Sequence, residues 1–239
     1  MKKALVLPLL ATLPLMAADD KKDDLFVSHL ELGYIQTDGN TNTRTFNAEG
    51  NIKKDIEKHS FKLGFDGQYA DDDGEKIKNR YKITGDYLYN FNDSLALGYV
   101  IGYKYDEFLG FDYQIATGPF VKYTALETKT QKLAFDVAGL YSRDKIKDGD
   151  SNDYGSAAAA LSYEWQMLEN LKFTENANYR VDVSDMDVYY VFSKTAFTSK
   201  ISDMFSAGIS YKVDYTNILP AGISSHTDKT FSINLILDY

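Results

Sequence analysis

Apolar and polar residues alternate along most of this chain with a period of two, which is typical of β-strands. The clearest example is a stripe of every second residue, formed by Leu95, Leu97, Tyr99, Ile101, Tyr103 and Tyr105. From Ser28 onward about twelve such segments, each of about ten to fourteen residues, are separated by polar breaks. No helical period of 3.6 residues competes in this region. The pattern therefore predicts an all-β chain.

The polar breaks alternate in length along the chain. Those near residues 54–58, 92–93, 126–130, 168–170 and 200–203 are short, whereas most of the others are longer, including 71–76, 145–153 and 217–227. Short turns at one end and longer loops at the other are typical of an antiparallel up-and-down transmembrane β-barrel. An exported soluble β-sandwich is the alternative, but its strands would be shorter and its core would have to receive about twelve tyrosine-rich apolar faces.

The last nine residues form an amphipathic strand that ends on an aromatic ring. Its apolar positions are Phe231, Ile233, Leu235, Leu237 and Tyr239. This segment resembles the closing strand of bacterial outer-membrane barrels, in which aromatic residues lie at the membrane interface. We expect it to pair with residues 28–37, which would remove the free edges of the sheet. We also expect it to be the signal that the barrel-assembly machinery recognises.

The first residues of the chain predict export. Residues 1–18 contain Lys2 and Lys3, then a nearly continuous apolar run, then Ala17 and Ala18. This order is typical of a secretory signal peptide, with cleavage expected after Ala18. The predicted organisation is a signal peptide at 1–18, a polar N-terminal segment at 19–27 and a barrel at 28–239. The predicted location is the cell outer membrane.

Three positions disturb the alternation. Pro119 lies on an apolar stripe, where its missing N–H predicts a β-bulge. Glu175 falls on an apolar face without an evident reason. The phase of 188–198 is ambiguous, and we choose Tyr189 and Val191 as outward positions because this choice turns Lys194 inward.

Composition excludes several kinds of chemistry. The chain has no cysteine, which excludes disulfides, thiolate metal ligands and a cysteine nucleophile. Its formal net charge is −9, and without a basic stripe this argues against nucleic acid as a partner. The expected partners are outer-membrane lipid and lipopolysaccharide, the barrel-assembly machinery and periplasmic chaperones.

The first predicted hairpin carries a specific motif. Leu32-Gly33-Tyr34 leads into Thr37-Asp38-Gly39-Asn40-Thr41-Asn42-Thr43, in which Gly39-Asn40 supplies the positive φ angles that a tight turn requires. This hairpin resembles the opening of a domain-of-unknown-function family whose members are labelled salt-induced outer membrane proteins. The resemblance implies an outer-membrane barrel and carries over no catalytic residues.

Enzymatic and metal sites have weak support. His29, His59 and His226 lie in separate parts of the pattern, so we do not expect them to converge. An outer-membrane hydrolase would depend on His226 beside Ser224 and Ser225, but no supporting base and third group are apparent. The acidic segments 71–75 and 148–153 lack the ligand spacing of a calcium loop. We expect no catalytic residue, no metal and no cofactor.

The polar face carries nearly equal numbers of both charge signs. The residues predicted to line the lumen are Lys62, Arg80, Lys82, Asp86, Lys104, Asp106, Lys122, Asp136, Glu164, Arg180, Asp182, Lys212 and Asp214. The same face also contains Glu31, Glu49, Asp66, Lys172, Lys194 and Asp238. Unpaired charges in a narrow lumen cost several kcal/mol, so pairing is expected.

Two functions fit such a lumen. A narrow passive channel for small polar solutes or ions would use the charges as a pathway. A non-conducting structural or stress-related envelope protein would use them to hold its shape. The hydrolase is a remote third possibility.

Overall fold

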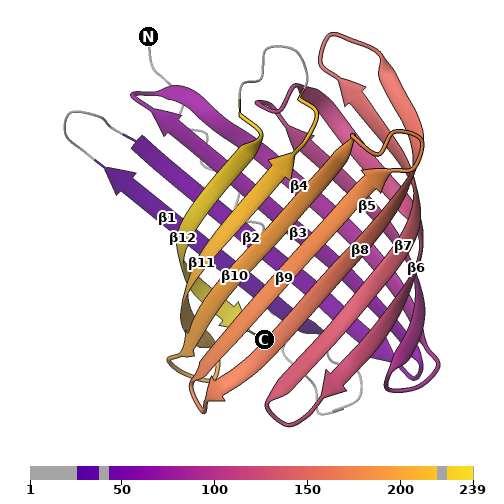
Figure 1. Ribbon diagram of the computed structural model, residues 1–239. Helices are drawn as coiled ribbons and strands as arrows, with labels where there is room; N and C mark the ends of the chain where they lie inside the picture. Colours follow the sequence, from indigo (N-terminus) through magenta and orange to yellow (C-terminus); the bar gives the residue numbers. More distant parts are fainter. Residues whose placement is uncertain (1–25, 38–42, 220–224, 239) are drawn as a thin grey trace.

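The structure is a computed structural model that describes residues 26–37, 43–219 and 225–238. Every strand pairs antiparallel with its sequence neighbours, and β1 pairs with β12, so the sheet closes into a barrel (Figure 1). This confirms the predicted antiparallel barrel. The strands are β1 (Val27–Thr37), β2 (Thr43–Ile56), β3 (His59–Asp72), β4 (Glu75–Asn90), β5 (Leu95–Asp106), β6 (Phe111–Glu127), β7 (Gln131–Ile146), β8 (Ser151–Leu168), β9 (Leu171–Asp182), β10 (Tyr189–Lys200), β11 (Phe205–Thr216) and β12 (Thr227–Asp238).

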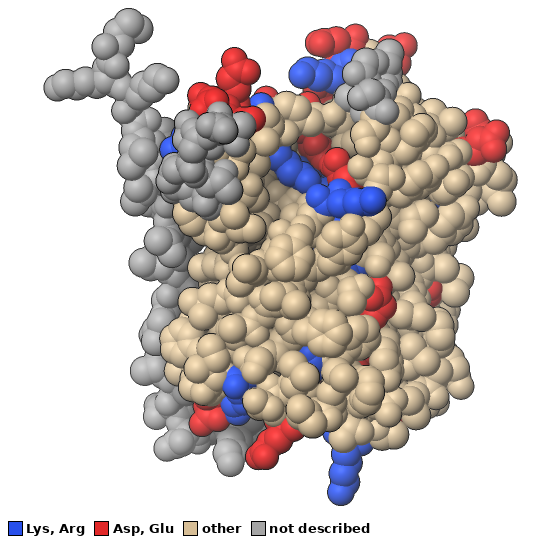
Figure 2. Space-filling view, turned by 60° about the vertical axis from the view of Figure 1, so that its left-hand side comes forward, with Lys and Arg blue, Asp and Glu red and all other residues tan. Residues whose placement is uncertain are grey.

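The period-two alternation separates an apolar outer wall from a polar interior. On β5 the apolar stripe points outward, so Tyr99 is 51% and Ile101 57% exposed, whereas Ala96 is 4% exposed on the inner face. Figure 2 shows an outer wall of mostly uncharged side chains, with most of the charged ones toward the two ends of the barrel and a few at mid-height. An outward apolar band of this kind matches the hydrocarbon layer of a membrane. The part of the chain that the structure describes contains no helix long and apolar enough to span a membrane.

Aromatic rings form contacts between neighbouring strands near both ends of the wall. At one end Tyr189 stacks on Tyr215 at 5.8 Å, and Tyr215 stacks on His226 at 5.9 Å. Toward the other end the rings of Phe61 on β3 and Tyr87 on β4 have their centroids 5.4 Å apart. Rings with polar tips at these levels are typical of membrane interfaces.

The hairpin between β3 and β4 is tighter than the sequence predicts. The two strands extend through Asp72 and Glu75, so only Asp73 and Gly74 remain in the turn. Both have positive φ angles, of 48° and 84°. The expected acidic loop at 71–76 was wrong in its bounds, because the turn geometry needs only two such residues.

The junction between β1 and β12, which we call the seam, has the shortest hydrogen-bonded register in the barrel. Within residues 26–37 and 225–238 it runs over five residue pairs, from His29↔Asp238 to Gly33↔Asn234. Other neighbouring strands share at least eleven pairs, as β1 and β2 do. The predicted pairing of the closing strand with the first strand is therefore confirmed, but over a shorter stretch than 28–37.

The structure shows how the barrel accommodates the three irregular positions. The bulge expected at Pro119 was wrong, because Thr117↔Tyr141 and Phe120↔Ala138 keep one register on either side of it. Glu175 accepts hydrogen bonds from Ser193 Oγ at 2.8 Å and Thr195 Oγ1 at 2.5 Å on β10, so its charge is partnered on the outer face. Lys194 points inward as predicted and is 7% exposed.

The predicted signal peptide and most of the polar segment lie outside the described residues.

Candidate functional site

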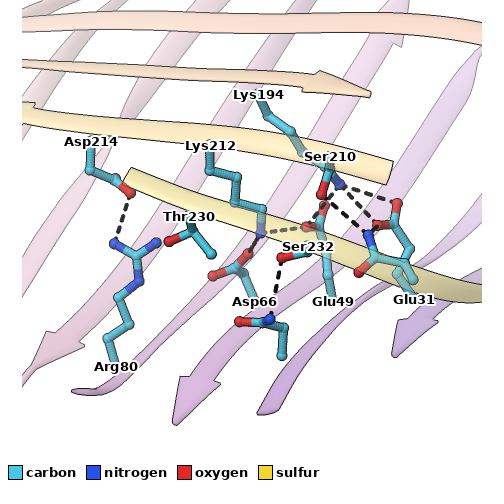
Figure 3. Close-up of polar contacts among 12 residues, drawn as sticks. Glu31, Glu49, Asp66, Arg80, Lys194, Ser210, Lys212, Asp214, Thr230 and Ser232 are labelled. Atoms are coloured by element: carbon cyan, nitrogen blue, oxygen red, sulfur yellow. Dashed lines mark hydrogen bonds and ion pairs between the residues drawn. The ribbon is translucent and has the colours of Figure 1, made fainter. Parts of the chain in front are cut away.

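Charged side chains form a cluster on the lumen side of the seam. Its members come from β1, β2, β3, β10 and β11, and we call it the seam cluster: Glu31, Glu49, Asp66, Lys194 and Lys212. Figure 3 shows the two lysines reaching toward the three carboxylates. The strands that carry the lysines lie on one side of the seam, and those that carry the acids lie on the other.

The distances within the seam cluster are those of ion pairs. Lys194 Nζ lies 3.1 Å from Glu31 Oε1 and 3.0 Å from Glu49 Oε2. Lys212 Nζ lies 2.7 Å from the same Glu49 oxygen and also pairs with Asp66. The lysine side chains are only 8% and 6% exposed. Because these contacts cross the seam, they join its two sides where the backbone register is short.

Asn234 of β12 adds hydrogen bonds from an uncharged side chain to this cluster. Its Nδ2 donates to Glu31 Oε2 at 2.9 Å and to Ser210 Oγ at 3.2 Å. Asn47 Nδ2 donates to Ser232 Oγ at 3.2 Å in the same region. Buried polar groups are stable when they are hydrogen-bonded in this way, so this side of the interior is a packed polar core.

Two further contacts cross the interior between β4 and the closing strands. Arg80 Nη1 lies 2.7 Å from Asp214 Oδ2 on β11 (Figure 3), and Arg80 is 6% exposed. Lys78 Nζ donates to Thr230 Oγ1 at 3.3 Å and lies 3.8 Å from Asp228 Oδ2 on β12. These contacts cross the interior near the end that carries the loops after β3, β5 and β11.

A second group of cations has a different environment. Lys82 and Lys104 are directly opposite on β4 and β5, two residues beyond Arg80 and two before Asp106. Arg180 on β9 acts electrostatically on Lys82 from across the interior. We call Lys82, Lys104 and Arg180 the basic cluster. Among the described residues no carboxylate oxygen lies within 4.0 Å of a nitrogen of these three side chains.

Some inward side chains are exposed to solvent. Asn176 is paired in register with the inward Lys194, and Asn178 follows two residues later, so both point inward. Both are exposed, as are the inward Lys62 and Lys82. An inward side chain can be exposed only to water in the lumen. The inner faces of β3, β4 and β9 therefore border water-accessible space.

The remaining predicted lumen residues fall into two groups. Lys122 and Asp136 are opposite each other with 3.8 Å between Nζ and Oδ1, whereas Lys62 faces Asp86 and Glu164 faces Lys132 in register. Asp106 and Asp182 instead accept hydrogen bonds from loop backbone, from Phe108 N at 3.2 Å and Ser184 N at 2.7 Å. The last two therefore stabilise loops at one rim.

Glu107 is a further carboxylate at the rim, in the loop after β5, and its contacts favour its ionised form. Asn79 Nδ2 donates to Glu107 Oε2 at 2.7 Å, and Lys76 Nζ lies 2.8 Å from the same oxygen. The hydrogen bonds from Asn79 and Lys76 lower the pKa of Glu107 below its ordinary value. Glu107 is therefore ionised at neutral pH.

The predicted assembly-signal residues of β12 form an outward apolar stripe. Phe231 is 54%, Ile233 58% and Leu235 47% exposed, and Leu237 is half-buried. Leu235 and Leu237 pair with β1 on one side and β11 on the other. Tyr239 lies outside the described residues.

The histidines lie in separate environments. His29 contacts Glu31 at 2.9 Å and Asp238 at 2.5 Å, whereas His59 contacts the Tyr87 hydroxyl at 2.9 Å. His226 Nδ1 lies 2.8 Å from the carbonyl oxygen of Thr216. Within the described ranges, no group of three or more acidic or histidine side chains is placed to hold a metal ion.

The structure defines a closed antiparallel β-barrel with an apolar outer wall and a charged interior, and its fold resembles that of outer-membrane channels. The NanC porin has a similar structure, with a TM-score of 0.56 and 9% identity over 88% of this chain and 98% of that one. The COG4313 outer membrane channel from Pseudomonas putida F1 has a TM-score of 0.53 and 7% identity over 93% of this chain and 99% of that one. At these identities the similarity shows the fold alone.

The chain belongs to the family of proteins of unknown function named DUF481, whose model matches residues 30–239. A relative is the uncharacterized protein YdiY of Escherichia coli (strain K12), which is 21% identical over 211 residues, covering 88% of this chain and 82% of that protein. The predicted membership in the family of salt-induced outer membrane proteins is confirmed.

The set of predicted lumen residues contained only one member of the seam cluster, Lys212. Glu31, Glu49, Asp66 and Lys194 were expected to point inward but were not singled out. Alternation reveals the face of a side chain, but it does not reveal which inward residues meet across the lumen. A signal was present nevertheless, since Lys194 and Lys212 need carboxylates once both are turned inward.

Proposed function

We propose that this protein is a narrow passive channel for small polar solutes in the outer membrane. The observation that carries the proposal is the exposure of inward side chains on β3, β4 and β9, namely Lys62, Lys82, Asn176 and Asn178. Eight-stranded barrels are filled by their side chains and sixteen-stranded porins hold a wide aqueous channel, so a barrel of intermediate size suits a narrow one. The similarity to the NanC porin and the COG4313 channel supports the same function.

A non-conducting structural protein is the second candidate. The observation that favours it is the pair Arg80–Asp214, with 2.7 Å between Nη1 and Oδ2, which joins β4 to β11 across the interior. Such a contact stiffens the barrel and obstructs part of the lumen. In either case we propose no enzymatic step, and the lipid, the assembly machinery and the chaperones would act as partners in placing the barrel.

Planar-bilayer recording on the refolded full-length protein separates the two candidates. We expect reproducible single-channel steps; their absence would contradict the channel. Asn178→Trp fills water-accessible space on the inner face and should lower the conductance by about half in so narrow a barrel. The matched control is Leu97→Trp on the lipid-facing side, where Leu97 is 46% exposed, and this variant should conduct normally.

A further inference from the structure

The lumen contains a pair of opposed lysines that form no ion pair within the described part of the chain. Lys82 and Lys104 are register partners on β4 and β5, so both ammonium groups leave the same face of the wall. Like charges directly opposite on neighbouring strands destabilise a sheet. Arg180 adds a third positive charge that acts on Lys82. The described part of the chain brings no carboxylate oxygen within 4.0 Å of these side chains.

Other carboxylates of this region already have partners. Asp66 and Asp214 both act electrostatically on Lys82. However, Asp66 pairs with Lys212, and Asp214 accepts from Arg80 Nη1 at 2.7 Å. Withdrawing Asp214 would leave the buried Arg80 without its ion pair, which is strongly unfavourable, and withdrawing Asp66 would leave Lys212 with Glu49 alone. Asp66 is opposite Lys82 in register and Asp106 acts electrostatically on Lys104, but neither acid forms an ion pair with these lysines.

A neutral donor beside the basic cluster also lacks a partner. Gln114 is opposite Lys104 on β6 and is only 6% exposed. Its Nε2 has no hydrogen-bond partner among the described residues. Arg180 lies over the ring of Tyr190, with 4.5 Å from Cζ to the ring centroid, so its guanidinium plane is held in place. Arg180 Nη1 also donates to Ser142 Oγ at 3.5 Å, and Gln114 is opposite Asp144 on β7. Gln114 Nε2 and the two lysines remain donors without a hydrogen-bond partner among the described residues.

We infer that Lys82, Lys104, Arg180 and Gln114 form a binding site in the lumen for a small carboxylate, an inference that rests on the channel proposed above. A carboxylate supplies two oxygens that match the paired N–H groups of a guanidinium, and it neutralises the opposed lysines. The exposed amides of Asn176 and Asn178 on the same strand as Arg180 can hydrogen-bond to hydroxyl groups. Hydroxylated carboxylates therefore fit this lumen best.

The first test measures binding on refolded full-length protein in detergent micelles. Gluconate serves as the hydroxylated carboxylate, and glucose serves as its neutral counterpart. We expect gluconate to raise the Tm and glucose to leave it unchanged. Stabilisation by glucose equal to that by gluconate would overturn the inference, and so would equal stabilisation by inorganic phosphate, since the site would then not select carboxylates.

Variants tie the binding to named side chains. Lys82→Gln and Lys104→Gln should each weaken gluconate binding about tenfold, the effect of about 1.4 kcal/mol from one lost charged contact. Lys82→Arg keeps the charge and should retain most of the affinity. The control Lys200→Gln removes a lysine that pairs with Asp203 at a turn, and it should bind gluconate normally. Unchanged gluconate affinity in both Lys82→Gln and Lys104→Gln would overturn the inference. If one of these variants does not fold, the affinity of the other decides the test.

Bilayer recording separates failure of this site from failure of the channel. In a KCl gradient the wild type should prefer Cl⁻ over K⁺, and the Lys82→Gln variant should lose most of that preference. If the protein conducts but neither binds gluconate nor prefers anions, the binding site is overturned and the channel proposal is still supported. Protein that binds gluconate but never conducts would support the site and contradict the channel.

Discussion

Two of the opposed lysine pairs on the inner wall of this barrel differ in their surroundings. Lys194 and Lys212 face each other on β10 and β11, and Lys82 and Lys104 face each other on β4 and β5. The first pair is buried among three carboxylates, with Glu49 Oε2 at 3.0 and 2.7 Å from the two ammonium nitrogens. The second pair has no carboxylate partner in the described part of the chain, and Lys82 is exposed to the lumen.

The difference shows how one local pattern serves two purposes. The first pair lies beside the seam, whose backbone register is only five pairs long, and its ion pairs hold the two sides together. The second pair lies where neighbouring strands share long registers, so the wall needs no such support. Positive charge there is free to meet a solute.

The largest expected effect comes from removing a member of the seam cluster. Lys212→Gln leaves Glu49 and Asp66 without one of their cations, and breaking a buried pair in this way costs about 3–5 kcal/mol. The measurement is urea unfolding followed by the fluorescence of Trp165. The exposed pair Lys200–Asp203 provides the control, because Lys200→Gln should cost at most about 1 kcal/mol. Equal midpoints for the two variants would refute a supporting role for the seam cluster.

A smaller effect is expected from a methyl group added within the seam. A Cβ on Gly33 would lie 2.7 Å from Asn234 Oδ1 and 3.1 Å from the carbonyl oxygen of Ile233. Gly33→Ala should therefore destabilise the barrel by about 1–3 kcal/mol, as overpacking does. At Gly139 an added Cβ meets nothing within 4 Å, so Gly139→Ala is the matched control. Faster amide hydrogen exchange in β1 and β12 should accompany the first variant; if both variants behave alike, close packing at the seam is not limiting.

The smallest effect has the opposite sign and concerns the second lysine pair. Lys104→Gln relieves repulsion with Lys82, so it should stabilise the barrel by about 0.2–1 kcal/mol at low ionic strength without added carboxylate. Salt screens exposed charges, so the gain should shrink at high ionic strength. Urea unfolding at two salt concentrations measures it. Destabilisation by Lys104→Gln at low salt would mean that Lys104 already has a partner.

Much of the fold was predictable from alternation alone. The period of two predicts the number and order of the strands, the outward stripe on β12 and the inward position of Lys194. It does so because lipid favours apolar side chains on one face of each strand and water favours polar ones on the other. Glu175 broke the pattern, and its partners Ser193 and Thr195 were visible only once β9 and β10 were paired. Pro119 was given a bulge that the barrel does not need.

The sequence by itself determined which side chains point into the barrel, since neighbouring residues of a strand must face opposite sides. It also determined the family, through the first hairpin and the match over residues 30–239. Only the tertiary structure decided which inward charges meet. Glu49 and Lys212 are far apart along the chain, and strand tilt and closure bring them together, whereas Lys82 and Lys104 form no ion pair within the described part of the chain. Coulombic pairing depends on distance in space, which the order of residues does not specify.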